Sequence, residues 1–372
     1  MNIAIVIEGG VDRSGEYRVI PVVLGLLERL ARRHSVHVFA LRQEASPGRW
    51  DLCGAHVHNI GSARPTPWIV LAGIGAVLRE HRVARFDVVQ ALWAGPGCLV
   101  AASVARLTGL PLLVHLTGGE LVGLHEIGYG AQLRPHWRWI NRQVLRRSTC
   151  VTATSAPIVA LARKSGVAAL RVPLGIDLRA WPLREPAVRP AGSELRMIQV
   201  ASLNLVKDHA TTLAAVRLLL ARGHRITVDF VGEDTLRGSI QSRARELGLT
   251  EVVRFHGFLT QRQLRPVMES AHLHVVSSLH EAGPAAALEA AVIGIPTVGT
   301  NVGHLAEWSP EAARVVPPRN PAAMATEIET LLTDEPLRLR VARAAQARAI
   351  AEDADYTAAC FEKLYAEFSG SR

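Results

Sequence analysis

Two glutamates eight positions apart, Glu281 and Glu289, lie in the segment of this 372-residue chain with the clearest chemical potential. Between them, Gly283 permits close backbone approach, and Pro284 suits the first turn of a helix. Small residues from Ala285 onward leave room for a ligand at the helix start, where free N–H groups and the helix dipole favour a pyrophosphate. Both carboxylates can accept hydrogen bonds from hydroxyl groups. The pattern predicts a sugar-nucleotide site; the alternative is an ordinary strand–loop–helix with an exposed Glu281.

This segment continues as Ala-x-x-Gly-x-Pro-Thr and resembles the E-x7-E signature of the retaining GT-B glycosyltransferases, the large family 4 or group 1 class. A second segment, Val200–Asp208, resembles the G-R-L-x-x-x-K-G motif of that class. The resemblance implies that Lys207 neutralises the donor diphosphate. Ser202 stands where the class usually has Arg, so we expect either Asn204 with the helix start, or another arginine, to compensate.

Two further segments follow in the order that the resemblance requires. Val228–Asp234 resembles a strand ending in G-x-G, with Asp234 in place of the last glycine. Phe255–Leu259 resembles the F-x-G-x-V/L segment, whose backbone reads the nucleobase edge. The donor-binding residues implied by the resemblance are Gly9, Gly10, Gly15, Ser202, Asn204, Lys207, Gly232, Glu233, Gly257, Phe258, Leu259, Glu281, Ala282, Gly283, Pro284, Ala285 and Glu289. It implies Glu281 at the donor sugar and Glu289 at the ribose.

The N-terminal half carries two weaker segments. Glu8–Gly15 is similar to the class's glycine-rich loop after the first strand, where backbone must approach the reacting sugar closely. Pro111–Glu120 looks like P-V-V-x-T-x-H-G-x-D/E, whose histidine touches the donor sugar. Thr117 takes that position, and His115 lies two residues earlier on the same strand face, so it can substitute. The expected catalytic set is Lys207, Glu281, His115 and Thr117; the alternative for His115 is a buried structural role.

A basic stripe marks the segment Leu133–Arg147. Arginines recur every four residues beside Trp and Leu, which predicts an amphipathic helix suited to an anionic membrane surface. A solvated helix face is the alternative. The residues expected on the acceptor or membrane side are Asp12, Arg13, Gly118, Gly119, Glu120, Arg138, Arg142 and Arg146.

Short apolar runs alternate with helical patterns along the chain, which is typical of parallel sheets covered by helices. We expect strands at Ile3–Ile7, Val36–Leu41, Val88–Leu92, Leu112–Leu116, Leu195–Ala201, Thr227–Val231, Val252–Phe255, Leu273–Val276 and Pro296–Val298. Helices are expected at Val19–Arg33, Thr211–Ala221, Ile240–Leu247, Ala285–Ile293 and about Asp355–Phe368. The Pro-rich stretch Pro173–Pro190 is expected to link two halves.

The fold class predicted is therefore α/β, a GT-B arrangement of two Rossmann-like domains facing an interdomain cleft. We place an acceptor-binding domain at 1–180 and a donor-binding domain at 181–352. Residues 353–372 are expected to form a helix that packs back on the first domain.

The distribution of charge indicates the kind of partner, and the cysteines indicate the compartment. Residues 1–180 hold 21 Lys and Arg against 11 Asp and Glu, whereas 181–372 hold 21 against 22, so the net charge of +9 belongs to the first half. A basic N-terminal half favours an anionic partner, such as a membrane surface, a phosphorylated acceptor or nucleic acid. The four cysteines form no CxxC pair and the chain shows no metal-ligand spacing, which favours a reducing cytoplasm. The longest apolar runs are shorter than the roughly 20 residues that span a bilayer.

The resemblance implies a retaining transferase that moves a sugar from a UDP-, GDP-, ADP- or dTDP-linked donor to a glycan, lipid-linked or small-molecule acceptor. No metal or other cofactor is expected, because no DxD pair stands at a suitable place. Cytoplasmic location, with contact to the inner membrane face, follows as an expectation. A non-catalytic nucleotide-sugar sensor is the first alternative. A nucleic-acid-binding protein ranks last, because no aromatic stacking platform accompanies the basic residues.

Overall fold

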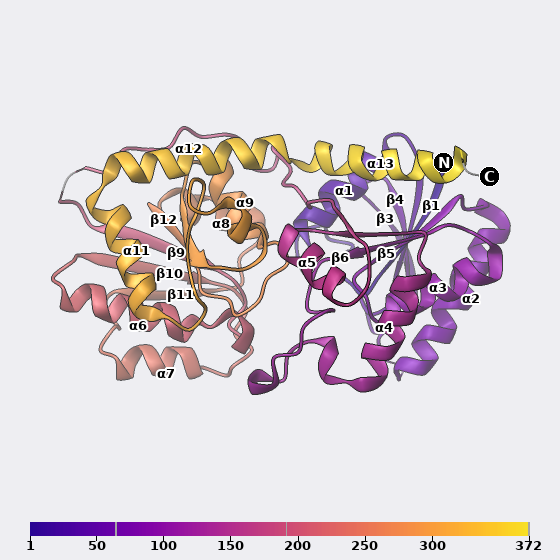
Figure 1. Cartoon of the computed structure of the whole chain (residues 1–372), viewed down its shortest axis with the longest axis horizontal. Helices are drawn as coiled ribbons and strands as arrows, with labels where there is room; N and C mark the ends of the chain where they lie inside the picture. Colours follow the sequence, from indigo (N-terminus) through magenta and orange to yellow (C-terminus); the bar gives the residue numbers. More distant parts are fainter. Residues whose placement is uncertain (64, 191, 371–372) are drawn as a thin grey trace. The chain divides into compact units, whose positions relative to one another are not determined.

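The computed structural model describes residues 1–63, 65–190 and 192–370. These residues form two compact units, Met1–Asp177 together with the segment from Glu352 onward, and Leu178–Ala351. The expected boundary after residue 180 lies three residues beyond the observed one. Each unit contains a sheet with helices packed against it (Figure 1).

The first unit is built on an eight-stranded sheet in the order β3-β4-β2-β1-β5-β6-β7-β8. All neighbouring strands are parallel except β3, which runs antiparallel to β4. The strand order reverses direction between β1 and β5, which makes this the topological switch point of the unit. The strands are β1 (Asn2–Ile7), β2 (Ser35–Ala40), β3 (Gly48–Leu52), β4 (Ala55–Asn59), β5 (Val88–Leu92), β6 (Leu112–Leu116), β7 (Cys150–Ala153) and β8 (Leu170–Arg171).

The helices of the first unit are α1 (Pro21–Ala31), α2 (Thr66–Ala84), α3 (Pro96–Thr108), α4 (Pro135–Arg147), α5 (Ala156–Lys164) and α13 (Ala354–Gly370), with 3₁₀ turns η1 (His125–Ile127) and η2 (Ala131–Leu133). The C-terminal α13 lies beside α1, as the yellow helix of Figure 1 shows. Thr357 at its start donates a hydrogen bond to the carbonyl of Pro173 at 2.8 Å, and Phe361 and Tyr365 are fully buried. The last segment of the chain therefore completes the core of the first unit.

The second unit has a six-stranded parallel sheet in the order β11-β10-β9-β12-β13-β14. Its strand order is that of a doubly wound nucleotide-binding fold, with the switch point between β9 and β12. The strands are β9 (Leu195–Val200), β10 (Ile226–Val231), β11 (Val253–Gly257), β12 (Leu273–Val276), β13 (Thr297–Thr300) and β14 (Arg314–Val316). The helices are α6 (His209–Ala221), α7 (Ser239–Glu246), α8 (Gln261–Glu269), α9 (Ala285–Val292), α10 (Gly303–Trp308), α11 (Pro321–Thr333) and α12 (Glu335–Ala351), with a 3₁₀ turn η3 (Leu205–Lys207).

All nine predicted strands and all six predicted helices, including the one at Leu133–Arg147, are present, with ends displaced by no more than two residues. Burial explains the success, because the strands of a helix-covered parallel sheet are apolar throughout. The hairpin of β3 and β4 was missed, since β3 is an edge strand with exposed polar residues. The Pro-rich stretch forms no helix or strand over its described residues after β8, as expected for a linker.

Candidate functional site

Lys207 and Glu281 lie at the carboxyl ends of the two strands that flank the switch point of the second unit. Lys207 ends η3, in the loop after β9, and Glu281 lies in the loop after β12. Because adjacent parallel strands end at the same edge of a sheet, the two loops meet. The Nζ atom of Lys207 lies 2.5 Å from Oε1 of Glu281, and the hydroxyl of Ser278 donates to the same oxygen at 2.6 Å. An ammonium and a carboxylate thus face each other where such domains bind ligands.

A buried polar network holds these two loops together. The Ser277 hydroxyl donates to the backbone carbonyl of Lys207 at 2.7 Å and accepts a hydrogen bond from the Gln199 amide at 2.9 Å. The amide oxygen of Gln199 in turn accepts from the Thr212 hydroxyl at 2.7 Å. All three network side chains are at least 99% buried. No sequence motif marks this network, and its one signal is a polar residue, Gln199, inside an otherwise apolar stretch of strand.

The rest of the β9 loop shapes the turn that carries Lys207. The side-chain oxygen of Asn204 accepts from the backbone N–H of Lys207 at 3.1 Å and begins η3. Asn204 therefore positions Lys207. Ser202 is half-buried in the same loop. The amide of Asn204 carries no charge, so it does not supply the positive charge that the arginine of the family motif provides.

The segment from Ala282 to Ala285 forms the entry to α9. Pro284 precedes the first helical residue, Ala285, as the sequence predicts. Gly303 packs under this loop with φ of +52°, and a Cβ at that position would lie 2.9 Å from the carbonyl oxygen of Ala282. The close approach fixes the backbone ahead of the helix. The first N–H groups of α9 and its dipole give this end of the helix affinity for an anion.

Glu289 lies on the buried face of α9 and is only 3% exposed. Its Oε1 accepts a hydrogen bond of 2.6 Å from the Gln261 amide, whose oxygen accepts from the Trp181 indole at 2.5 Å. Burial raises the pKa of Glu289 to about 7, although the Gln261 hydrogen bond opposes that rise. A ribose contact for Glu289 stays a prediction, and the Gln261 hydrogen bond occupies one of its two carboxylate oxygens.

The loop after β10 begins at Gly232, where a Cβ would lie 2.1 Å from the carbonyl oxygen of Ala201. Only glycine allows the ends of β9 and β10 to approach this closely. Glu233 follows and is exposed, and its carbonyl accepts from the backbone N–H of Leu203. Asp234, which replaces the last glycine of the family motif, accepts from the N–H groups of residues 236 and 238 at 2.7 Å each. Its carboxylate closes the turn that a glycine would otherwise make.

The loop after β11 presents Gly257, Phe258 and Leu259. Gly257 ends the strand with φ of +69°, and Phe258 is 51% exposed, while Leu259 is half-buried. Thr260 then starts α8 with a capping box to Gln263. An exposed aromatic ring on a well-anchored loop suits contact with a flat ligand such as a nucleobase.

In the first unit, the glycine-rich loop after β1 is held by one side chain. The Oε1 of Gln43 accepts from the backbone N–H groups of Gly10 and Val11 at 2.7 and 2.9 Å. Gly10 has φ of +91°, and a Cβ there would clash with Ile20 at 2.5 Å. Gly9 adjoins a cavity described below. Gly15 lies beyond it and closes a turn to Asp12.

Asp12 and Arg13 were predicted to contact an acceptor, but both make local interactions. Asp12 accepts from the backbone N–H of Ser14 at 3.0 Å. Arg13 forms two hydrogen bonds of 2.8 Å with Glu44, and its guanidinium lies 5.0 Å from the centre of the Trp50 ring. These contacts give both side chains a structural role in the loop, and an acceptor contact for them remains a prediction.

Glu120 organises the loop after β6. It is 4% exposed, and its carboxylate accepts from the backbone N–H groups of Thr117, Gly118 and Ala94. Burial raises its pKa against the opposing effect of these hydrogen bonds. The loop is thereby fixed at the carboxyl ends of β5 and β6. The hydroxyl of Thr117 is buried and makes no hydrogen bond among the described residues.

A cavity of about 600 Å³ opens at this end of the first unit, between the loops after β1, β5 and β6. Gly119 lies at its wall and approaches the Tyr129 ring so closely that a Cβ would lie 2.8 Å from it. The side-chain amide of Asn141 is 1% exposed, and neither of its polar atoms has a protein partner. The chemically distinctive lining residues are Glu8, Trp93, Glu120, Tyr129, Trp137 and Asn141. Only Glu120 among them was predicted, since aromatic residues in loops carry no sequence spacing that marks a cavity.

His115 does not contact this cavity, and its predicted donor contact is not supported. The side chain is fully buried, with Nδ1 2.8 Å from the Thr152 hydroxyl and the ring packed edge-on against Phe361 at 5.2 Å. Burial lowers its pKa to about 3, so the imidazole is neutral. The strand face that carries His115 points into the core, as the structural alternative required.

Two family patterns match the chain over most of its length. The pattern described as Glycosyl transferases group 1 matches residues 185–348, and the Glycosyl transferase 4-like domain matches residues 19–175. The chain belongs to the group 1 glycosyltransferases.

Relatives of this glycosyltransferase agree with the assignment. The chain is 28% identical to the glycogen synthase of Mycobacterium tuberculosis over 279 residues, which cover 73% of this chain and 66% of the synthase. Its structure resembles that of sucrose-phosphate synthase from Thermosynechococcus elongatus, with a TM-score of 0.82, 17% identity and full coverage of both chains. It also resembles Anabaena HepE in complex with UDP-glucose, with a TM-score of 0.74, 17% identity and full coverage of both. The predicted GT-B fold, with two parallel-sheet α/β domains, is confirmed.

The predicted basic helix of the glycosyltransferase is α4. Its arginines Arg138, Arg142 and Arg146 are exposed, and Trp139 is 64% exposed on the same helix. Its buried face carries Asn141, which reaches the cavity. Among the described residues, no helix combines the length and apolar character needed to cross a bilayer.

Proposed function

We propose that this glycosyltransferase transfers a sugar from a nucleotide-diphosphate sugar, held by its C-terminal unit, to a hydroxyl-bearing acceptor held by its N-terminal unit. The observation that carries the proposal is the Lys207–Glu281 pair at the switch point of a doubly wound sheet, beside the start of α9. HepE, which shares the fold, binds UDP-glucose. A UDP-linked donor is therefore the first to test.

Lys207 and the first N–H groups of α9 supply positive charge for the departing diphosphate. Glu281 accepts hydrogen bonds from the sugar hydroxyls. Its Oε1 already receives Lys207 and Ser278, which leaves Oε2 for the sugar. When the donor binds, the ammonium of Lys207 can be shared between Glu281 and the diphosphate. This arrangement places positive charge next to the diphosphate oxygens, where negative charge develops as the bond to the sugar breaks.

The proposed reaction retains configuration at the anomeric carbon. The bond from that carbon to the diphosphate oxygen breaks, and the acceptor oxygen bonds to the same face of the sugar. A leaving phosphate oxygen takes the acceptor proton, which accounts for the lack of an assigned protein base. Lys207 and the helix start carry the charge that a metal ion would otherwise carry, so the proposal includes no metal in the reaction.

The cavity of the N-terminal unit is the proposed acceptor site. Trp93, Tyr129 and Trp137 offer flat apolar surfaces, while Glu8 and the unpartnered amide of Asn141 offer polar groups. Such a mixture suits a ring that carries hydroxyl groups on its edge and C–H groups on its face. We propose a glycan or lipid-linked acceptor.

The test of the donor site is a thermal-shift and calorimetric panel of UDP, GDP, ADP and dTDP with their common sugars. One nucleotide should raise the Tm by mass action, and Lys207→Ala should abolish the rise. Lys363→Ala is the matched control, because Lys363 is an exposed lysine on α13. If no nucleotide shifts the Tm of the native protein, the donor-site proposal is wrong.

Ser202, which stands in place of the family's arginine, favours one second candidate: a protein that binds nucleotide sugars without turnover. Incubation with a radiolabelled donor and an acceptor library separates the two. Transfer or slow donor hydrolysis supports the enzyme. Tight binding with neither product supports the sensor.

Peripheral attachment at the inner membrane face is proposed from α4. Its exposed arginines and Trp139 match the chemistry of an anionic interface. The native protein should sediment with vesicles that contain phosphatidylglycerol at low salt. The triple variant Arg138→Gln, Arg142→Gln, Arg146→Gln should lose that binding while it keeps its nucleotide affinity.

A further inference from the structure

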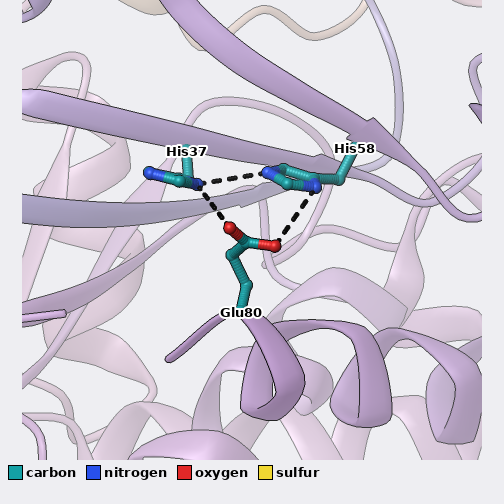
Figure 2. A group of neighbouring side chains, drawn as sticks. All are labelled: His37, His58 and Glu80. Atoms are coloured by element: carbon teal, nitrogen blue, oxygen red, sulfur yellow. Dashed lines mark hydrogen bonds and ion pairs between the residues drawn. The ribbon is translucent and has the colours of Figure 1, made fainter. Parts of the chain in front are cut away.

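Three potential metal ligands converge in the first unit, away from every residue assigned above. Figure 2 shows His37 and His58 projecting from the sheet and Glu80 rising toward them from a helix. His37 belongs to β2, His58 to β4 and Glu80 to the last turns of α2. Among the described residues, this is the one group of three or more His, Cys, Asp or Glu side chains whose ligand atoms lie close enough to hold a metal ion.

The strand register explains why the two histidines meet. In the parallel pair of β2 and β4, His58 lies opposite Phe39, and His37 lies two residues before Phe39 on the same face. His37 and His58 are therefore diagonal neighbours across the two strands. Their rings are held by aromatic packing, since His58 stacks on Phe39 at 4.7 Å and His37 meets Phe86 edge-on at 5.2 Å. The ligand positions are fixed before any ion arrives.

One hydrogen bond joins the two histidine rings, whereas the Glu80 carboxylate lies close to both rings without a hydrogen bond to either. Nδ1 of His37 lies 3.2 Å from Nε2 of His58 and 3.7 Å from Oε1 of Glu80, and Nδ1 of His58 lies 4.0 Å from Oε2 of Glu80. The two contacts to the carboxylate are longer than a hydrogen bond. A tetrahedral ion with bonds of about 2.0 Å separates its ligands by roughly 3.3 Å. These three contacts use both ring nitrogens of His58 and both oxygens of Glu80. When one ligand atom is taken from each residue, the three atoms lie within 4.8 Å of one another, so side-chain rotations would have to bring them to that separation.

Groups around the three side chains orient them as outer ligands usually do. Nε2 of His37 lies 3.4 Å from the Ser35 hydroxyl, so Nδ1 is the nitrogen that faces His58 and Glu80. A guanidinium nitrogen of Arg49 donates to Oε2 of Glu80 at 3.2 Å, which leaves Oε1 on the side of His37. Such partners of the second layer are typical of protein metal sites. Arg49 is 67% exposed, so water screens its charge from an ion.

Both histidine ligands are buried, with His37 and His58 less than 9% exposed. A cavity of about 400 Å³ adjoins the group and gives an ion and its water a route of entry.

We propose that His37, His58 and Glu80 bind a divalent transition-metal ion of the zinc class, with water as the fourth ligand. Two imidazoles and one carboxylate are ligands that Zn²⁺ accepts in a tetrahedral site. The ion would join β2 and β4 to α2, and its three ligands lie 21 and 22 positions apart in sequence. Its role is structural, because none of the residues in the proposed donor and acceptor sites belongs to this group.

The test uses tag-free, full-length protein treated with EDTA and then dialysed into metal-free buffer. Zn²⁺ is titrated in competition with a chromophoric chelator, and Co²⁺ is used as a spectroscopic probe in a parallel sample. We expect one equivalent of Zn²⁺ to bind and a visible Co²⁺ spectrum of tetrahedral intensity to appear. Bound Zn²⁺ should raise the Tm by mass action, with or without nucleotide.

The variants His37→Gln, His58→Gln and Glu80→Gln should each weaken Zn²⁺ binding by at least about 100-fold, because loss of a direct ligand exceeds the 10- to 100-fold cost of losing an outer partner. His56→Gln is the matched control. His56 is a neighbour on β4 whose ring is 55% exposed and hydrogen-bonds to Asp51, and it should bind Zn²⁺ as the native protein does. Glu80→Gln keeps shape and volume, so it reports on the site even if a histidine variant fails to fold.

The proposal is overturned if the native protein binds Zn²⁺ no more tightly than the double variant His56→Gln, Glu80→Gln does. It is also overturned if the Glu80→Gln variant folds and keeps the native affinity for Zn²⁺. Equal loss in His56→Gln alone would also overturn it, because the ligand set would then be different. A protein that binds no Zn²⁺ can still bind nucleotide, and a protein that binds no nucleotide can still bind Zn²⁺. The two proposals can therefore fail separately.

Discussion

The ammonium of Lys207 and the carboxylate of Glu281 lie 2.5 Å apart although 74 positions separate them in sequence. They meet because β9 and β12 are neighbours at the switch point of the sheet, and each strand delivers its following loop to the same edge. The pair is partly buried, with side chains 25% and 12% exposed. A cation held by an acidic partner, in a position where a diphosphate can reach it, is the central feature of the proposed donor site.

Glu281→Gln separates binding from transfer. The amide still accepts hydrogen bonds, but Lys207 loses its anionic partner and a diphosphate meets less negative charge. We expect UDP to bind at least as tightly as in the native protein, while kcat/KM for transfer falls about 100-fold or more, as when one charge-stabilising or orienting group is removed. Calorimetry and initial rates measure the two quantities. Weaker UDP binding with unchanged kcat would contradict the assigned role of Glu281.

Gly303→Ala should move the loop that leads into α9. The new Cβ would lie 2.9 Å from the carbonyl oxygen of Ala282, in a backbone with φ of +52°. We expect a loss of about 1–3 kcal/mol in the free energy of unfolding, together with a higher KM for the donor. Gly248→Ala is the control, because Gly248 has φ of +69° but open space around its Cβ position. Equal effects of both variants on the donor KM would show that the contact with Ala282 does not position the donor.

Much of this architecture could be predicted from sequence. Apolar strands and the order of motifs gave the two sheets, and the resemblance implied that Lys207 and Glu281 both serve the donor. The loop closure by Asp234 was not predicted, because a carboxylate that accepts two backbone hydrogen bonds can replace a glycine. The turn propensity of a single residue does not show that a carboxylate can take the place of glycine in this way.

The other differences between the sequence predictions and the structure come from tertiary packing. The period-two pattern placed His115 and Thr117 on one strand face, but every residue of β6 is buried, and α13 covers His115 with Phe361. His37, His58 and Glu80 have no ligand spacing in sequence, since they come from two strands and a helix. Their proximity depends on the pairing of β2 with β4. Long-range pairing of this kind is not encoded in any local pattern.

His115→Leu tests the structural role of the buried histidine. The variant removes the 2.8 Å hydrogen bond to the Thr152 hydroxyl and the edge-on contact with Phe361. We expect the free energy of unfolding to fall by about 1–3 kcal/mol, since a buried polar group loses its partner. The donor KM should stay within about twofold of the native value. Chemical denaturation and steady-state rates are the measurements, and a large rise in donor KM without loss of stability would restore His115 as a donor contact.

Glu289→Gln should change how the free energy of unfolding depends on pH. The pKa of Glu289 is raised from 4.5 to about 7 by burial, so the folded state binds a proton more tightly than the unfolded state does. The stability that comes from the protonated carboxyl is fully present below about pH 4.5, declines as the pH rises, and is lost above about pH 7. The native protein should therefore lose about 3 kcal/mol across this range relative to Glu289→Gln, whose amide does not titrate. Urea unfolding of both proteins from pH 4.5 to 8 measures the difference. If the two curves stay parallel throughout, folding does not raise the pKa of Glu289, and the proposed protonated state of the buried carboxyl near neutral pH is wrong.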